Sequence, residues 1–101
     1  MATDVTDNPE KSRYDITDDG KPAGFAEYHR YEREIAFIHT EIDPEFAGRG
    51  LAGTLARAAL DDARAQGLAV LPYCPFIRGW LGKHPDYVDL VPEAQRARFG
   101  L

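Results

Sequence analysis

One segment near the middle of the chain constrains the fold more than any other. Residues 35–42 form an apolar, strand-like run, and residues 46–53 (FAGRGLAG) follow it with three glycines before an alanine-rich run begins. Glycine lets the backbone approach a ligand closely, and the first N–H groups of a helix have no partner within that helix. The helix dipole also favours negative charge at this end. The segment therefore predicts a strand, a turn and a helix N-terminus that binds a phosphate or pyrophosphate, as in a nucleotide-like cofactor.

The residues before this turn predict an antiparallel meander. Residues 12–17 and 23–31 read as strands, separated by turn residues at 18–22, and the polar stretch 30–34 leads into the strand at 35–42. Within the second strand, Phe25 and Tyr28 are expected on opposite faces. Residues 1–10 are polar and are expected to form a flexible N-terminal segment, with room for a short edge strand near Val5. Residues 11–101 are then the single folded domain.

The residues after the turn predict a parallel strand and two or three helices. Small and apolar side chains recur at helical spacing up to Gly67, a helix stop signal, and residues 68–73 read as a short strand. A strand, a helix and a strand with short connections make a βαβ unit, so the last two strands are expected to be parallel. Further helices are predicted at 76–83 and 93–99, with 90–91 as a short strand or packed coil. The predicted fold class is α+β.

Composition excludes several classes of protein. The chain has 101 residues and a net charge of −5, which argues against non-specific nucleic-acid binding. No apolar run approaches the ~20 residues of a membrane span, and the N-terminus has no signal-peptide pattern. The single cysteine, Cys74, excludes an internal disulfide and fits a reducing compartment. A soluble cytoplasmic protein is expected.

The glycine turn alone leaves alternatives. A plain strand-to-helix loop would also use glycine. The spacing of residues 50–53 is a poor fit to a dinucleotide-binding fingerprint, and a Walker A loop is excluded because no Gly-Lys-Ser/Thr follows.

The turn resembles the acyl-CoA pyrophosphate loop of the GNAT superfamily of N-acetyltransferases, whose pattern is Gln/Arg-x-x-Gly-x-Gly/Ala. Gly50 and Ala52 match its two small positions, whereas Ala47 stands in the Gln/Arg place. The segments 37–42 (FIHTEI), 72–77 (PYCPFI) and 84–87 (HPDY), with Trp80, resemble the small single-domain subgroup of that superfamily, over roughly residues 4–91. The resemblance implies a minimal GNAT-like fold: a mixed, mostly antiparallel sheet with a central parallel βαβ unit.

The resemblance also implies a cosubstrate and an acceptor. The cosubstrate is acetyl-CoA, and the reaction is acetyl transfer to an amine. Most GNAT proteins have two helices between their first two long strands that help hold the acceptor, but only residues 18–22 separate those strands here. The acceptor side is therefore expected to be open, or to be completed by a partner such as a second copy of the chain or another protein. A CoA-binding or protein-interaction module without turnover remains an alternative.

The strand at 35–42 supplies candidates for acid–base chemistry. By the two-residue period of a strand, Ile35, Phe37, His39 and Glu41 are expected on one face, with the last two near the turn. An attacking amine must be neutral, and histidine, with an unperturbed pKa of ~6.5, is a suitable base near pH 7. Glu41 would orient His39 or act through water. A histidine hydrogen-bonded in a half-buried sheet is the structural alternative.

Cys74 is the candidate nucleophile. It ends the second parallel strand and precedes Pro75, which favours the first position of a helix, so Cys74 is expected at the N-cap. A thiol there can be activated by the helix dipole. Cys74 would carry an acetyl group transiently, line the thioester pocket, or act as a small buried hydrophobe.

The remaining aromatic and histidine residues are expected to be structural. Trp80, Phe76, Ile77 and Tyr87 are predicted core residues, with protonation of the CoA thiolate as a second option for Tyr87. His84 is expected to cap a helix or pack on Trp80. A metal site is not expected, because the histidines and the cysteine lack ligand spacing. Arg57 and Asp61 are expected to form an i,i+4 pair.

The sequence thus predicts an acetyl-CoA-dependent N-acetyltransferase with direct attack by the amine, or transfer through Cys74 as the second route. The predicted catalytic residues are His39, Glu41 and Cys74. The predicted cofactor-binding residues are Ile42, Gly48, Arg49, Gly50, Leu51, Ala52 and Gly53.

Overall fold

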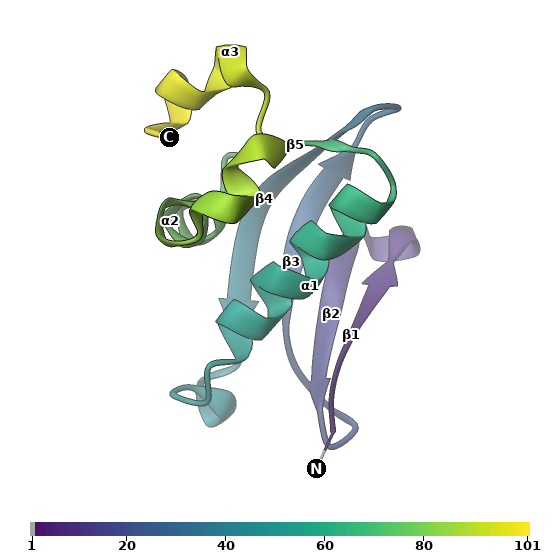
Figure 1. Cartoon of the computed structure of the whole chain (residues 1–101). Helices are drawn as coiled ribbons and strands as arrows, with labels where there is room; N and C mark the ends of the chain where they lie inside the picture. The colour runs from purple at the N-terminus through teal and green to yellow at the C-terminus, as the bar shows by residue number, and fades with distance from the viewer. Residues whose placement is uncertain (1) are drawn as a thin grey trace.

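A computed structural model of the chain describes residues 2–101. It contains one five-stranded sheet in the order β1-β2-β3-β4-β5, and Figure 1 shows helix α1 lying across one face of this sheet. The strands are β1 (Thr3–Asn8), β2 (Arg13–Asp18), β3 (Lys21–Arg30), β4 (Glu34–Ile42) and β5 (Ala69–Pro72). The helices are α1 (Leu51–Ala65), α2 (Pro75–Lys83) and α3 (Glu93–Arg96), with 3-10 turns η1 (Pro9–Lys11), η2 (Pro44–Phe46), η3 (Pro85–Leu90) and η4 (Ala97–Phe99).

The predicted α+β class and the antiparallel meander are confirmed. Strands β1 to β4 pair as consecutive antiparallel neighbours. The β2–β3 turn is tight because Asp19 and Gly20 both have positive φ, 50° and 80°, as this kind of hairpin turn requires. Strand β1 is longer than the short strand expected near Val5, and it pairs with β2 along all six of its residues.

Helix α1 supplies most of the contact between the helices and the sheet. Its buried face follows the predicted helical spacing and packs on the sheet face that carries Tyr14, Tyr28 and Phe37. Small side chains let the helix approach the sheet closely, and fully buried Leu55 and Leu60 fill the remaining space. Burying one leucine side chain fully contributes about 1.5–3 kcal/mol. The buried residues of α1 are Leu51, Leu55, Ala56, Ala59, Leu60 and Ala63.

The predicted parallel pair is confirmed, and it is short. Strand β5 pairs with β4 from Glu34↔Ala69 to Phe37↔Pro72 and no further. Beyond that point the Cys74 N–H donates to the Phe37 carbonyl at 2.8 Å. Residues 38–42 of β4 therefore pair with β3 alone, and their second backbone edge has no strand partner within the described chain.

The prediction that Ile35, Phe37, His39 and Glu41 share one face is wrong. Phe37 pairs with Tyr28, whereas His39 pairs with Glu27, so β4 contains one extra residue at this point. Such a β-bulge shifts the alternation of the strand by one position. Ile35 and Phe37 consequently lie on the buried α1 face, and His39 and Glu41 lie on the opposite, open face of the sheet.

The C-terminal elements cover the end of the sheet beside α1. Helix α2 begins at Pro75 as predicted. Leu90, the last residue of η3, and Val91 after it are both buried, and neither lies in a strand. The predicted helix at 93–99 is divided into α3 and η4. None of the helices in residues 2–101 is both long enough and apolar enough to cross a membrane.

Candidate functional site

The glycine turn lies between η2 and α1, as the sequence predicts. Gly48 and Gly50 have φ values of 81° and 73°, which side chains other than glycine rarely adopt. Gly50 is the N-cap of α1 and therefore provides no side chain to cap the helix. A Cβ atom added to Gly48 or Gly50 would meet no atom within 4 Å, so the space beside the turn is open.

The backbone of this turn offers several free donors. Within residues 2–101, no acceptor is recorded for the N–H groups of residues 48–53, and the first α1 bond at this end runs from the Thr54 N–H to the Gly50 carbonyl. Leu51 points its side chain into the core, whereas Ala52 and Gly53 are half-buried. The free N–H groups and the positive end of the α1 dipole thus converge on one open position.

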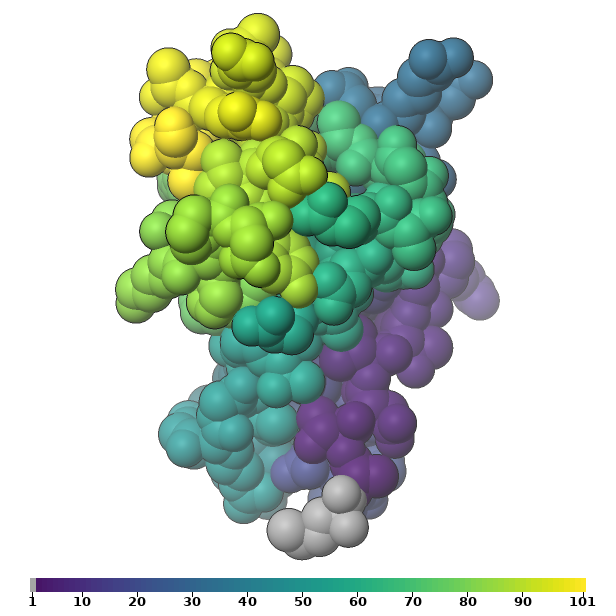
Figure 2. All heavy atoms as spheres, viewed as in Figure 1, coloured from purple at the N-terminus to yellow at the C-terminus, as the bar shows by residue number. Residues whose placement is uncertain are grey.

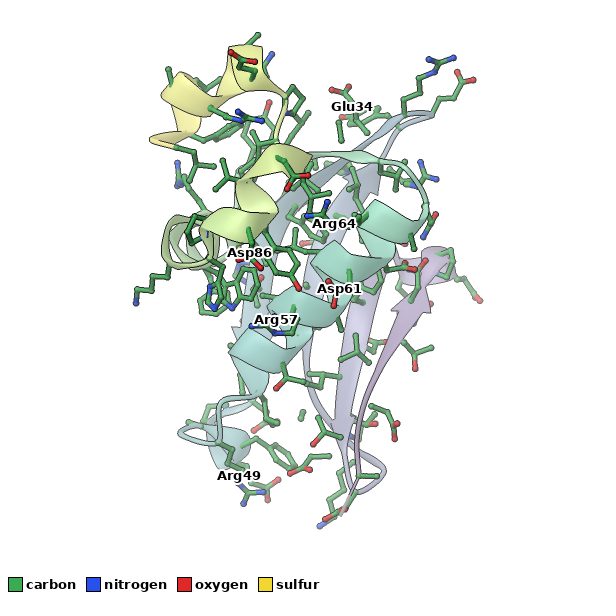
Figure 3. The ribbon with its side chains drawn as sticks, in the orientation of Figure 1. Glu34, Arg49, Arg57, Asp61, Arg64 and Asp86 are labelled. Carbon is green, nitrogen blue, oxygen red and sulfur yellow. The ribbon has the colours of Figure 1, made fainter. Side chains whose placement is uncertain are left out.

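Arg49 adds a positive charge to the turn, but its guanidinium already pairs with Asp18. Its Nη1 atom lies 3.1 Å from Asp18 Oδ2, and its guanidinium lies 5.2 Å from the centre of the Phe46 ring. Figure 3 shows Arg49 at the turn below α1. The ion pair ties the turn to the end of β2 and reduces the charge that Arg49 presents to a ligand.

A groove of about 470 Å³ runs from the turn along α1 toward α2. Its α1 wall consists of Gly50, Gly53, Thr54, Arg57, Ala58 and Asp61, and its α2 wall consists of Trp80 and His84. Figure 2 shows α2 and the residues after it lying against α1 on this face of the molecule. The groove therefore extends the glycine turn into a larger concave site.

Two stacked residues on the α2 side form one wall of this groove. The His84 ring stacks on Trp80 with the ring centres 3.7 Å apart, and His84 Nδ1 lies 2.8 Å from the Trp80 carbonyl oxygen. His84 is also the C-cap of α2. Both structural expectations for His84 are confirmed.

The predicted Arg57–Asp61 pair is wrong as a direct contact. The Arg57 guanidinium donates to the Tyr87 hydroxyl at 3.2 Å, and that hydroxyl donates to Asp61 at 2.7 Å. The hydrogen bond to Asp61 raises the pKa of Tyr87 above its ordinary value. Figure 3 shows Arg57 and Asp61 on the side of α1 that faces the segment containing Asp86. Tyr87 therefore joins η3 to α1, in agreement with its predicted core position.

His39 and Glu41 are brought together on the open face of the sheet. His39 Nε2 lies 3.7 Å from Glu41 Oε1, and the two side chains are 54 % and 61 % exposed. The His39 ring also packs near Phe25, with the ring centres 6.1 Å apart. A substrate approaching this face would reach the imidazole without displacing any buried side chain.

Cys74 lies in a different environment. It is the N-cap of α2, as predicted, but its side chain is only 1 % exposed. Its Sγ atom lies 3.3 Å from Thr40 Oγ1. Thr40 pairs with buried Ala26, so this thiol contact is on the α1 side of β4, whereas His39 projects from the other side.

The structure thus groups the predicted residues into three neighbouring places. The glycine turn includes Gly48, Arg49 and Gly50, and Ile42 lies half-buried at the end of β4 that leads to it. His39 and Glu41 occupy the open sheet face, and Cys74 lies at the point where β5 leaves β4. No contact between Cys74 and His39 is recorded among the described residues.

Sequence reasoning missed the α2-side groove and Thr40. The α1 residues of this groove are three or four positions apart, so a helical projection that starts from the glycine turn places them on one face. They include Gly50, Gly53, Thr54, Arg57 and Asp61. The contact between Thr40 and Cys74 joins residues 34 positions apart, and no local pattern marks it.

Comparison with known proteins identifies the fold family. The sequence profile of the GCN5-related N-acetyl-transferases matches residues 13–90, which is more than half of the chain. No curated protein matches the chain in sequence.

Solved structures that resemble this one include the following three. A GCN5-like protein from Staphylococcus aureus is 23 % identical with a TM-score of 0.66, and the match covers 87 % of this chain and 86 % of that one. The ribosomal-protein-S18-alanine N-acetyltransferase from Escherichia coli is 25 % identical with a TM-score of 0.54, covering 57 % and 38 % of the two chains. Ard1 from Thermoplasma volcanium is 25 % identical with a TM-score of 0.52, covering 60 % and 43 %.

These matches agree with the resemblance predicted from residues 46–53 and the other motifs. The match to the Escherichia coli enzyme spans well under half of that protein's length, and the Staphylococcus aureus match extends over nearly the whole of both chains. Together with the five-stranded sheet and its parallel β4–β5 pair, they establish that the chain belongs to the GCN5-related N-acetyltransferase family.

Proposed function

We propose that this protein binds acetyl-CoA and transfers the acetyl group to an amine. The observation that carries the proposal is the open turn at residues 48–53. Its free N–H groups form the positive end of α1, and the turn follows residues 38–42 of β4, whose edge on the β5 side is unpaired. Family membership supports the same reaction class.

The described residues fit the parts of this cosubstrate. Pyrophosphate needs several N–H donors in a space without side chains, which Gly48 and Gly50 provide. The edge of residues 38–42 suits the pantetheine amides, since an extended ligand can pair with an unpaired strand edge. The groove beside Arg57 and Trp80 offers a cation and an aromatic wall for the rest of the nucleotide. Acetyl-CoA supplies an activated thioester.

His39 is the proposed base. In this mechanism the imidazole accepts the proton that the amine loses as its nitrogen bonds to the acetyl carbon and the carbon–sulfur bond breaks. Glu41, 3.7 Å away, stabilises the imidazolium that forms. Cys74 lines the thioester end of the site, where β5 leaves β4, and direct attack by the amine is the proposed route.

CoA release in the presence of acetyl-CoA and a panel of amines tests turnover. His39→Gln is expected to lower the rate by about 10²-fold or more, within the usual range for loss of a general base. His29→Gln is the matched control, because His29 is an exposed histidine on neighbouring β3. Equal rates for both variants would remove His39 from the mechanism.

Intact mass after incubation with acetyl-CoA alone separates the two routes. An acetyl adduct that is present in the wild type and missing in Cys74→Ala would replace direct attack with transfer through Cys74. It would leave the acetyl-CoA assignment standing.

The second candidate is a CoA-binding module without turnover. Two observations favour it: Ala47 stands at the Gln/Arg position of the loop pattern, and the β2–β3 connection is a tight turn at Asp19 and Gly20 with no helix between the strands. Binding of CoA without release of CoA from acetyl-CoA, for every amine tested, would favour this candidate. A thermal shift with acetyl-CoA tests whether the protein binds this cosubstrate, as both candidates require, because a ligand that binds the native state must stabilise it.

We also propose a cytoplasmic location, consistent with the single free cysteine.

A further inference from the structure

The face of the sheet opposite α1 contains a second cavity, of about 460 Å³. This volume is typical of sites for small molecules. The cavity is formed by β2, the start of β3, and the end of β4 with the start of η2. Phe25, Ile42 and Pro44 make part of its apolar wall. It is separate from the groove between α1 and α2, because no residue lines both.

The charged residues of this cavity are mainly acidic. Asp15, Glu41 and Asp43 line it, against one cation, Arg13. Arg13 Nε lies 2.7 Å from Asp15 Oδ1, and Asn8 donates to Asp15 Oδ2 at 2.9 Å, so Asp15 is already satisfied. Glu41 and Asp43 are thus the carboxylates left to face a ligand.

The Phe25 ring makes a cation–π contact within this cavity. The Arg13 guanidinium lies 4.7 Å from the centre of the Phe25 ring, within the range of a cation–π contact. The same ring lies 6.1 Å from the His39 ring. Phe25 and Glu41 therefore connect the acidic cavity with the proposed base.

We infer that this cavity binds the acceptor, and that the acceptor is a free aliphatic polyamine. The inference rests on the proposed function. One amine lies beside His39 and Glu41, the methylene chain crosses Phe25, and a second, charged amine faces Asp43. Asp43 is four positions after His39, a span of about 13 Å in extended backbone, so an acceptor that contacts both residues carries its second charge at that distance.

Binding of spermidine to the protein without acetyl-CoA tests the site independently of turnover. We expect spermidine to shift the backbone amide NMR signals of Phe25, Glu41 and Asp43 and to bind more tightly than 1,3-diaminopropane, which is too short to span the cavity. The neutral control is 1,8-octanediol, a chain of equal length without charge, which is expected not to bind. Equal binding of the diol would overturn the inference.

Matched variants separate this site from general attraction to an acidic protein. Asp43→Asn is expected to weaken spermidine binding about three- to fivefold, the effect of losing an exposed ion pair, and the amide oxygen still accepts the 3.0 Å bond from the Glu45 N–H. Glu45→Gln removes the same charge two residues away, outside the cavity, and is expected to change binding less than twofold. Equal effects of the two variants would overturn the inference.

Three further outcomes distinguish failure of this inference from failure of the proposed function. Tighter binding of a lysine-containing tripeptide than of spermidine would overturn the assignment to free polyamines. If spermidine binds as expected but no amine releases CoA from acetyl-CoA, the acceptor role falls with the proposed function. If CoA is released but Asp43→Asn leaves the KM for spermidine unchanged, this inference fails and the proposed function stands.

Discussion

The Sγ atom of Cys74 lies 3.3 Å from the hydroxyl of Thr40. This contact joins the residue before α2 to the part of β4 that does not pair with β5. The contact lies where β5 leaves β4, next to the 2.8 Å bond from the Cys74 N–H to the Phe37 carbonyl. With the thiol 1 % exposed, a reagent can reach it only after β4 and α2 separate locally.

Alkylation of Cys74 should therefore report this local opening. In the native protein, iodoacetamide is expected to react with the thiol at least about tenfold more slowly than in urea, since opening a packed element costs free energy. Thr40→Val should accelerate the reaction relative to Thr40→Ser, which keeps the hydroxyl. Mass spectrometry over time measures both rates. A native rate equal to that in urea would mean that the thiol is accessible without opening.

Substitution of Gly50 should weaken CoA binding more than an equivalent substitution at the other end of α1. Gly50→Ala and Gly67→Ala change glycines with φ values of 73° and 70°, and neither new Cβ would meet an atom within 4 Å. Both should cost about 1 kcal/mol of stability from backbone strain. Only Gly50→Ala places a methyl group at the free N–H groups, so CoA binding should weaken about tenfold or more.

Calorimetric titration with CoA gives the affinities. Urea unfolding checks that the two substitutions lower the free energy of unfolding by the same amount. If Gly67→Ala weakens CoA binding as much as Gly50→Ala, the effect is one of stability and the turn does not hold the pyrophosphate.

Stability should decline above pH 10 because of two buried tyrosines. Burial, followed by the hydrogen bond to Asp62, raises the pKa of Tyr14, and burial with the hydrogen bond to Asp7 raises the pKa of Tyr28. The folded state therefore holds these protons more tightly than the unfolded chain. Their contribution to stability is complete below the unfolded pKa of ~10 and is lost as the pH rises above it.

Urea unfolding between pH 8 and pH 11 measures this decline. Tyr14→Phe and Tyr28→Phe should each make the decline shallower, because each removes one titrating group. Tyr31→Phe, at a 54 % exposed position, is the control and should leave the slope unchanged. A wild-type slope that persists in both buried variants would contradict this explanation.

Gly24 should tolerate no side chain. A Cβ atom there would lie 2.3 Å from the Glu41 carbonyl oxygen and 2.8 Å from Ile42 Cδ1. Gly24→Ala should force β3 and β4 apart and cost about 1–3 kcal/mol in the free energy of unfolding. Gly79→Ala, within α2 and with no neighbour inside 4 Å, should instead stabilise the protein by about 0.5–1 kcal/mol. Thermal unfolding of both variants decides, and equal melting temperatures would contradict the predicted clash.

The regular elements were predictable because their signals are local. The strand patterns of β2 to β4, the helical spacing before Gly67 and the Pro75 start of α2 each lie within one segment. The structure confirms these elements, although not the alternation of side chains in β4. The short loops on both sides of α1 were enough to predict the parallel β4–β5 pair. The length of β1 was underestimated, because its stability comes from pairing with β2 rather than from its polar sequence.

Local patterns in the sequence were enough to predict the fold family, the glycine turn with its free N–H groups, and the position of Cys74 at the start of α2. The faces on which the site residues lie depend on how distant segments pair and pack. One extra residue in β4, visible only in its pairing with β3, turned His39 and Glu41 to the open face and left Phe37 in the core. The Tyr87 bridge between Arg57 and Asp61 likewise joins segments about 30 residues apart. Strand register and contacts between distant segments depend on packing, which local sequence patterns do not encode.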